Sequence, residues 1–271
     1  ESKTGRILYE KNSNEKRYPA STTKIMTALL TLENVEDLQS KATVSYNAVF
    51  SVPSGYSVDT LKVGEELSVE ELLYALLVKS SNEAANVLAE YVAGNVDSFA
   101  TMMNTRAAEL GCKNTNFVNP NGIQNENHYT TVRDLTKLLS YALQNDTFRQ
   151  IYCTSEYTTS ATASAPEGLH FLSTMFKKMD SPEVNGGEIE GGKTGYTGEA
   201  GQCLASLAKV DDVEYILVTA GAPGGPSTEP YHIEDAKTVY NRIQAGEQGS
   251  AADTAADSQD DQAMTETDGA A

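Results

Sequence analysis

The stretch Pro19-Ala-Ser-Thr-Thr-Lys-Ile-Met-Thr-Ala-Leu-Leu30 decides how the rest of the chain is interpreted. It places Ser21 and Lys24 three positions apart at the start of an apolar run with helical spacing. Residues i and i+3 share one helix face, about 5–6 Å apart at Cβ, so the hydroxyl and the amine lie within reach of each other. The free N–H groups and the positive dipole end of a helix start also favour negative charge on a substrate.

This pair of residues can carry out nucleophilic chemistry. Serine is a weak nucleophile until a base takes its proton, and a lysine with a lowered pKa can be that base. The same pair also occurs with purely structural roles, as a helix-capping serine and a solvated lysine of the first turn. The rest of the chain therefore has to decide between chemistry and structure.

Length and charge limit the classes of function. The 271 residues, 39% of them hydrophobic, fit one large domain or two modest ones. A formal charge of −18 makes nucleic acid or an anionic membrane a poor partner. The apolar runs are too short to span a bilayer, which needs about 18 or more residues. No charged-then-apolar leader opens the sequence, so we expect the signal peptide of an exported protein to lie outside these residues.

Cysteine and histidine are sparse and scattered, which disfavours several kinds of site. Three cysteines without a C-x-x-C pair indicate buried or free thiols rather than a disulfide framework or a metal cluster. Three histidines in unrelated segments argue against a histidine-based triad or a zinc site. We therefore expect no metal and no cofactor. The residues concerned are Cys112, Cys153, Cys203, His128, His170 and His232.

The first two thirds of the chain predict a strand and then mainly helices. Residues 5–10 have the composition of a strand, and the Ser21 helix should run to about Leu32. Residues 41–63 alternate apolar and polar side chains, which indicates short strands and loops. Further helices are predicted after a capping box at Ser68, after Asn82, over 96–110 and from Thr131 to Leu143.

The pattern becomes strand-like near residue 186. Lys193-Thr194-Gly195 falls in the first predicted strand, and residues 200–210 form the next. Asp211-Asp212 is a two-residue hairpin turn before a return strand over 213–220. A last helix is expected over 233–243.

This order of elements predicts an α/β protein of the α+β type. An antiparallel sheet formed by both chain ends, with flanking helices and a mainly helical insertion over about 45–185, satisfies it. A site is expected in the cleft between sheet and insertion. We expect one catalytic domain over 1–245. The remainder, 246–271, is acidic and lacks Lys and Arg, so we expect a disordered tail or linker.

Two further short motifs accompany Ser21 and Lys24. Ser80-Ser81-Asn82 lies between two predicted helices, where the hydroxyl can relay a proton and the amide can hold a substrate peptide group. Lys193-Thr194-Gly195 lies in a strand, where the charge and the hydroxyl can bind a carboxylate. Gly195 would let the substrate and the Ser21 helix approach the backbone closely. Each motif alone also fits a structural role, as a helix cap or a solvated lysine before a glycine bend.

The three motifs keep the order S-x-x-K, S-x-N, K-T-G, which is typical of penicillin-binding proteins and class A β-lactamases. With them the sequence resembles the serine D-Ala-D-Ala carboxypeptidases, the low-molecular-mass penicillin-binding proteins of peptidase family S11. The resemblance covers about residues 3–245 and includes Phe117-Val-Asn-Pro-Asn-Gly and His128-Tyr-Thr-Thr. It implies a β-lactamase/transpeptidase-like fold.

The resemblance implies a role for each motif residue. Ser21 is expected to be the acylated nucleophile and Lys24 its general base, with Ser80 and Asn82 relaying protons and orienting the substrate. Lys193 and Thr194 would bind the terminal carboxylate, and Gly195 beside them would be a substrate-binding residue. The backbone N–H groups of Ser21 and Tyr196 would form the oxyanion hole, aimed at the charge that develops on the carbonyl oxygen.

The implied activity is that of a hydrolase that works in two acyl-transfer steps. The terminal D-Ala leaves first, and water then releases the shortened peptide. The implied partners are peptidoglycan stem peptides ending in D-Ala-D-Ala, and β-lactam antibiotics as covalent inhibitors. The implied place is extracytoplasmic, at the cell surface or secreted, with a role in cell-wall synthesis and cell shape.

The sequence departs from the family in two places. Typical members continue into a small β-rich domain and an amphipathic membrane-anchoring helix, whereas here the acidic segment 246–271 follows, so membrane anchoring is not encoded in these residues. Ser81 fills a middle position that is usually Gly or Ala in the family, while the outer residues Ser80 and Asn82 are intact.

Three alternatives share part of the pattern. A D,D-endopeptidase that cleaves crosslinks would use the same residues. A class A β-lactamase would add a deacylating Glu in a Glu-x-x-x-Asn loop before Lys193, and the polar loop around residues 121–128 lies far from the usual position of that loop. A non-catalytic wall-binding module would not need the Ser21–Lys24 pair.

Overall fold

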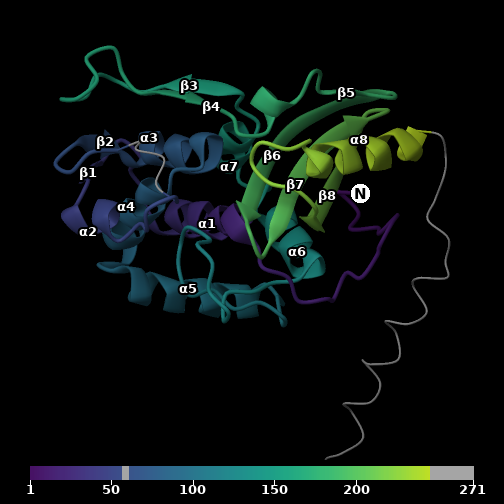
Figure 1. The fold of residues 1–271 in the computed structure, drawn as a ribbon, viewed down its shortest axis with the longest axis horizontal. Coiled ribbons are helices and arrows are strands. Elements are labelled where there is room, and N and C mark those ends of the chain that lie inside the picture. The colour runs from purple at the N-terminus through teal and green to yellow at the C-terminus, as the bar shows by residue number, and fades with distance from the viewer. Residues whose placement is uncertain (57–60, 245–271) are drawn as a thin grey trace, which may run out of the picture.

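The computed structural model describes residues 1–56 and 61–244 of the chain. A four-stranded antiparallel sheet stands beside a group of helices, and α1 runs through the middle of that group (Figure 1). The helices are α1 (Lys24–Asn34), α2 (Tyr46–Phe50), α3 (Val69–Tyr74), α4 (Asn82–Ala93), α5 (Val96–Glu109), α6 (Val132–Ala142), α7 (Asp146–Tyr152) and α8 (Tyr231–Gln244), with short turns η1 (Ala20–Thr23), η2 (Ala75–Lys79) and η3 (Phe176–Lys178). The strands are β1 (Lys41–Thr43), β2 (Glu66–Ser68), β3 (Glu156–Thr158), β4 (His170–Leu172), β5 (Glu183–Val184), β6 (Gly187–Thr197), β7 (Gly201–Val210) and β8 (Val213–Ala222).

The main sheet has the strand order β5-β6-β7-β8, and each neighbouring pair is antiparallel. The predicted hairpin between β7 and β8 is confirmed. Asp211 and Asp212 both have positive φ, 48° and 62°, as the two central residues of a type I′ turn require. The K-T-G motif lies in β6, as the sequence predicted.

The α+β class and the antiparallel sheet are confirmed, but the strand predicted over 5–10 is wrong. Those residues do not form a strand, and the N-terminal segment meets the sheet where the Ser2 N–H donates to the Glu214 oxygen of β8 at 2.8 Å. Ile7 and Tyr9, which gave the segment its strand composition, are exposed. These two apolar side chains therefore do not pack into a core, as those on one face of a strand would. Within the described residues, the main sheet consists of 183–222 alone.

The predicted helices form, and several short elements were not predicted. The capping box at Ser68 is confirmed, because its hydroxyl accepts from the Glu71 N–H and the Glu71 carboxylate accepts from the Ser68 N–H. The elements α2, α7 and the β3–β4 hairpin were missed. Each spans seven residues or fewer, too short for a periodic pattern to emerge.

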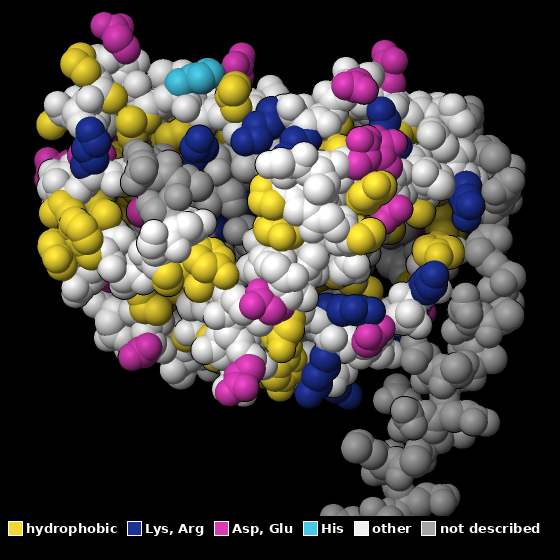
Figure 2. Space-filling view, viewed as in Figure 1, with side chains coloured by type: hydrophobic (Ala, Val, Ile, Leu, Met, Phe, Trp, Pro, Cys, Tyr) yellow, Lys and Arg dark blue, Asp and Glu magenta, His cyan; other side chains and the backbone are white. Residues whose placement is uncertain are grey.

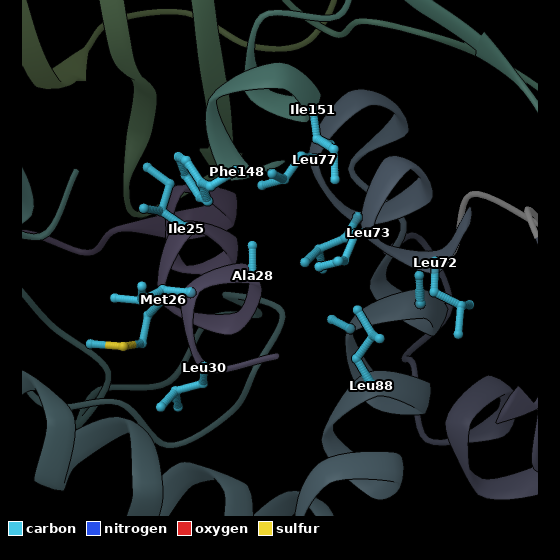
Figure 3. Close-up of a cluster of buried hydrophobic side chains, with 14 of the residues drawn as sticks. Ile25, Met26, Ala28, Leu30, Leu72, Leu73, Leu77, Leu88, Phe148 and Ile151 are labelled. Atoms are coloured by element: carbon cyan, nitrogen blue, oxygen red, sulfur yellow. The ribbon is translucent and has the colours of Figure 1, made fainter. Parts of the chain in front are cut away.

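The largest hydrophobic core surrounds α1. Ile25, Met26 and Ala28 have no exposed surface, and their side chains point to opposite sides of the helix (Figure 3). A helix that buries apolar side chains on more than one side lies inside the core rather than on its surface. Leu73 of α3 and Phe148 of α7 pack around it (Figure 3). Lys24 is therefore the first residue of a buried helix, and Ser21 lies in the η1 turn directly before it.

The sheet is covered on both faces. Alternate residues of a strand point to opposite faces, and in β7 Leu204 belongs to a cluster with Ile233 and Tyr240 of α8, whereas Ala205 and Leu207 belong to the α1 core. Among the described helices, none is long and apolar enough to cross a membrane. The predicted acidic tail lies outside the described residues, and the division into a 1–245 domain stays a prediction.

Candidate active site

Ser21 lies in η1, where the chain turns into α1. Ala20 has φ 47°, an uncommon conformation for a residue with a Cβ. Two glycines let other segments come close to this turn: a Cβ on Gly122 would lie 1.9 Å from the Ala20 oxygen, and one on Gly195 would lie 2.9 Å from the Ser21 nitrogen. The turn that holds the serine is therefore clamped between the 119–122 turn and strand β6.

Lys24 makes three hydrogen bonds from a fully buried ammonium group. Its Nζ lies 2.8 Å from Ser21 Oγ, 2.6 Å from Asn82 Oδ1 and 2.6 Å from the Asn121 backbone oxygen. An ammonium has three N–H donors and no acceptor, so all three are used. The amide oxygen and the carbonyl can only accept. When Lys24 is neutral, its two remaining N–H groups satisfy these two acceptors and its lone pair points at Ser21 Oγ.

The environment of Lys24 favours this neutral form. Burial lowers the pKa of Lys24 well below its ordinary value, and the positive charge of Lys193 lowers it further. The buried Glu83 carboxylate works in the opposite direction and raises the same pKa. The net effect lowers the pKa of Lys24, so its neutral, proton-accepting form is reached at a lower pH than for an ordinary lysine.

The Ser80-Ser81-Asn82 motif bridges η2 and α4, as the sequence predicted. Ser80 has φ 66°, which ends η2 and turns its hydroxyl toward Lys193 Nζ at 2.8 Å. Ser81 caps α4 by accepting from the Ala84 N–H. Asn82 accepts from Lys24 and donates through Nδ2 to the Tyr56 oxygen at 2.6 Å. The outer two residues of the motif thus contact the two lysines of the site, and the middle one caps the helix.

Lys193 lies buried behind the cleft rather than on its wall. Its side chain has no exposed surface, and Nζ donates to Ser80 Oγ and to the Thr194 oxygen, both at 2.8 Å. Burial lowers the pKa of Lys193 to about 7. Thr194 faces the cleft, and its hydroxyl is hydrogen-bonded to that of Thr174 at 2.7 Å.

These residues line one small open cleft. Ser21, Ser80, Thr194, Gly195 and Tyr196 all contribute to its wall. The fold therefore brings the residues that the sequence singled out from three separate segments to one place, with Lys24 and Lys193 directly behind the serines. In the described residues, no group of His, Cys, Asp and Glu is placed to hold a metal ion.

The sequence interpretation missed how the 116–130 segment supports the site. The Val118 N–H donates to His128 Nδ1 at 3.0 Å, so Nε2 carries the proton and donates to Thr23 Oγ1 at 2.8 Å. Burial, followed by the Lys24 charge, lowers the pKa of His128 to about 4 and keeps it neutral. The Thr27 hydroxyl donates to the Pro120 oxygen at 2.6 Å. Pro120 and His128 lie in two of the stretches that resemble the family, but the sequence alone indicates no role for either residue.

Comparison with known proteins identifies the family. Residues 1–224 match the peptidase S11 family, described as D-alanyl-D-alanine carboxypeptidase. The chain belongs to this family. Since the match covers the whole arrangement of Ser21, Lys24, Ser80, Asn82 and the K-T-G strand, the cleft described above is the candidate active site of a D-alanyl-D-alanine carboxypeptidase family member.

Relatives of the family differ in the activity that their names state. The chain is 35% identical over 223 residues to the D-alanyl-D-alanine carboxypeptidase DacF of Bacillus subtilis, covering 81% of this chain and 55% of that protein. It is 30% identical to a D-alanyl-D-alanine endopeptidase of Pseudomonas aeruginosa, over 90% of this chain and 75% of the relative. The crystal structure of the Streptomyces K15 DD-transpeptidase matches with a TM-score of 0.77 and 31% identity, over 89% of this chain and 94% of that one. The chain thus spans about half the length of DacF.

Proposed function

We propose that the chain is a serine D-Ala-D-Ala carboxypeptidase, which removes the terminal D-Ala from peptidoglycan stem peptides through an acyl-enzyme on Ser21. The observation that carries this proposal is the contact between Lys24 Nζ and Ser21 Oγ at 2.8 Å, with the other two partners of Lys24 restricted to accepting hydrogen bonds. Such a geometry aims a basic lone pair at one hydroxyl, as an activated nucleophile requires.

The acylation step follows from this arrangement. Neutral Lys24 takes the proton of Ser21, and the oxygen attacks the carbonyl carbon between the two D-Ala residues. The backbone N–H groups of Ser21 and Tyr196 hold the oxyanion. When the intermediate collapses, the C–N bond breaks and the proton returns from Lys24, with Ser80 as the relay, to the amine of the departing D-Ala.

Deacylation repeats the chemistry with water. Lys24 takes a proton from a water molecule, the hydroxide attacks the ester carbon, and Ser21 leaves with the proton from Lys24. Asn82 orients the substrate peptide group through its amide. Thr194 and the buried charge of Lys193 attract the terminal carboxylate during the first step, and Gly195 leaves room for the substrate beside the strand.

Covalent labelling and product release test the proposal together. Intact mass after benzylpenicillin treatment should show one adduct on Ser21, and a peptide ending in D-Ala-D-Ala should release D-Ala. Ser21→Ala should abolish both, while the variant keeps the melting temperature of the wild type. Absence of D-Ala release from the wild type, or release that survives in Ser21→Ala, would sink the enzyme proposal and favour a non-catalytic wall-binding module.

A second candidate function is endopeptidase cleavage of crosslinks, favoured by the 30% identity to a protein named D-alanyl-D-alanine endopeptidase. A crosslinked dimer of stem peptides and a linear peptide with a free D-Ala end, offered at equal concentration, separate the two activities. A penicillin adduct that persists for hours further separates either activity from a β-lactamase, whose adduct is hydrolysed within milliseconds.

The cellular role belongs to the same proposal. Removal of the terminal D-Ala would limit crosslinking and so influence cell shape, and the substrate is extracytoplasmic, which suits a secreted or surface-held protein. β-Lactams would act as covalent inhibitors, and the catalytic unit would comprise residues 1–245. Neither a metal nor a cofactor enters any step above.

A further inference from the structure

One face of α4 carries two asparagines that both lead to Lys24. Asn82 and Asn86 are four residues apart in α4, so their side chains lie on the same helix face. Asn82 Oδ1 accepts directly from Lys24 Nζ. Asn86 reaches the lysine through one further residue, because its Oδ1 accepts from Asn121 Nδ2 at 3.0 Å and the Asn121 backbone oxygen accepts from Lys24. Asn86 therefore lies one hydrogen bond behind an acceptor of the base.

The partners of Asn86 fix the direction in which its amide points. Asn86 Nδ2 donates to the Ala48 backbone oxygen at 3.1 Å and to Ser51 Oγ at 3.2 Å. Because a carbonyl oxygen can only accept, the Asn86 nitrogen faces α2 and its oxygen faces Asn121. The Ile123 N–H donates to Asn121 Oδ1 at 3.0 Å, which leaves Asn121 Nδ2 as the donor to Asn86. Backbone groups thus hold both amides in a single orientation.

This link lies away from water. Asn86 and Asn121 are both buried. The short helix α2 covers Asn86 from outside with its buried residue Ala48, whereas Tyr46 and Phe50 are each 64% exposed. Hydrophobic side chains gather at the left edge of the face in Figure 2, where α2 lies in Figure 1. Since water does not replace a lost partner at a buried amide, the two asparagines depend on each other.

The contact joins the 119–122 turn to the helix that supplies the other acceptor. Lys24 belongs to α1, and it donates to α4 at Asn82 and to the turn at Asn121. The hydrogen bond between Asn86 and Asn121 ties the turn to α4. Because the backbone of a helix is held by its own hydrogen bonds from one turn to the next, α4 sets the spacing between these two acceptors.

We propose that Asn86 is a positioning residue for the general base, and that it acts through Asn121 to keep the neutral amine of Lys24 aimed at Ser21. The inference rests on the proposed function, because it names the residue behind the base of the same reaction. If the Asn121 backbone oxygen moves, an N–H of neutral Lys24 loses its acceptor and the lone pair is no longer restricted to the direction of Ser21 Oγ. Proton transfer then slows in both acyl-transfer steps, while the groups that bind the substrate are unchanged.

Steady-state kinetics on a peptide ending in D-Ala-D-Ala test this role. In Asn86→Leu, kcat should fall about tenfold, a part of what a general base contributes, and KM should stay at the wild-type value. The rate is counted per molecule that prolonged benzylpenicillin treatment labels, so that a loss of folded protein does not imitate a loss of rate. Asn121→Ala removes the same contact from the other end and keeps the backbone oxygen. It should show the same fall, and it is the second variant if Asn86→Leu does not fold.

The double variant Asn86→Leu/Asn121→Ala separates positioning from general damage. If Asn86 acts through Asn121, the second change removes a contact that is already lost, so kcat should fall less than about twofold below that of either single variant. Two independent effects would instead multiply to a loss of about a hundredfold.

Asn104→Leu is the matched control. Asn104 of α5 also joins a helix to the 116–130 segment, because its Nδ2 donates to the Phe117 oxygen at 2.8 Å and its Oδ1 accepts from the Phe117 N–H at 2.7 Å. The same substitution there removes a comparable bridge without touching Asn121, so kcat should stay at the wild-type value.

Three results would overturn the assignment to Asn86: a wild-type kcat in Asn86→Leu or Asn121→Ala, an equal fall in Asn104→Leu, or losses that multiply in the double variant. A wild type that releases no D-Ala would instead contradict the proposed function, and the Asn86 proposal with it.

Discussion

The two lysines of the active site are equally buried but differently surrounded. Lys24 donates to acceptors from three separate segments, and two of these acceptors can never donate in return. Lys193 donates to a hydroxyl and to the carbonyl of the next residue in its own strand. Burial lowers the pKa of both. Burial alone makes a lysine less basic, whereas the hydrogen-bond partners decide in which direction the lone pair of the neutral amine points.

The largest effect is expected from Lys24→Met. Loss of the base should slow acylation by benzylpenicillin about 10²- to 10⁴-fold, the range that general-base catalysis contributes. Time-resolved intact mass measures the rate of adduct formation. An acylation rate within tenfold of the wild-type rate would show that Lys24 is not the base. The functional difference between Lys24 and Lys193 would then be wrong.

Lys193→Met should give a smaller loss that depends on the substrate. Removing a buried, hydrogen-bonded charge costs about 2–5 kcal/mol of transition-state binding. For a peptide with a free C-terminal carboxylate, kcat/KM should fall by the corresponding factor. The amidated peptide should lose less, because there only the anchoring of Ser80 is missing. Steady-state kinetics on both peptides measure the difference, and equal losses would remove Lys193 from carboxylate binding.

The pH profile should separate the two lysines. Activity requires neutral Lys24, so kcat/KM rises as pH increases through the lowered pKa of Lys24. It requires charged Lys193, so kcat/KM falls as pH increases past about 7, the pKa of Lys193 in the free protein. In Lys193→Met the falling limb should vanish and the rising limb should move to higher pH, since the Lys193 charge helps to lower the pKa of Lys24. A rising limb that stays in place would contradict their coupling.

Thr27→Val should weaken the positioning of the Asn121 backbone oxygen, which accepts a hydrogen bond from Lys24, without changing Lys24 itself. Its hydroxyl holds the Pro120 oxygen at 2.6 Å, one residue before the carbonyl that binds Lys24. Weakening an acceptor of the charged form lowers the pKa of Lys24, so the rising limb should move to lower pH while the plateau rate falls roughly tenfold. Thr31→Val is the control, because Thr31 is also buried in α1 but donates to the Thr27 oxygen within the helix. Identical profiles for the two variants would rule out a directing role for the 119–122 turn.

The smallest effect is expected from Ser81→Ala. Ser81 caps α4, and losing the cap costs about 1 kcal/mol of stability. Thermal unfolding should show this as a lower melting temperature, with the acylation rate unchanged. Ser80→Ala, one residue earlier, should instead slow acylation because it removes the partner of Lys193. A slower acylation in Ser81→Ala would mean that Ser81 contributes to the reaction and does not only cap α4.

Much of the site could be predicted because its side chains carry recognisable chemistry. The spacing of Ser21 and Lys24, the helix junction at Ser80 and the strand at Lys193 each follow from a local pattern, and their order indicated the family. The Asn121 acceptor could not be found this way, because a backbone carbonyl looks the same at every residue. Asn86 is similarly silent in the sequence, since only the fold brings it to Asn121.

The fold shows the same division between local and long-range information. The Ser68 capping box and the Asp211-Asp212 turn act over a few residues and were predicted correctly. Residues 5–10 have the composition of a strand, but a strand needs a partner, and that partner cannot be read from the segment itself. Short elements such as α7 depend on the surrounding core in the same way.

The contacts of Lys24 make covalent labelling a measure of folding. Its partners Asn82 and Asn121 are 58 and 97 residues away along the chain, so the proposed base acquires its contacts only after distant segments have come together. A chain that has formed α1 but has not docked the 119–122 turn would contain every catalytic side chain and still react slowly. Penicillin added during refolding would therefore label native molecules selectively, and the labelled fraction over time would follow the last assembly step of the protein.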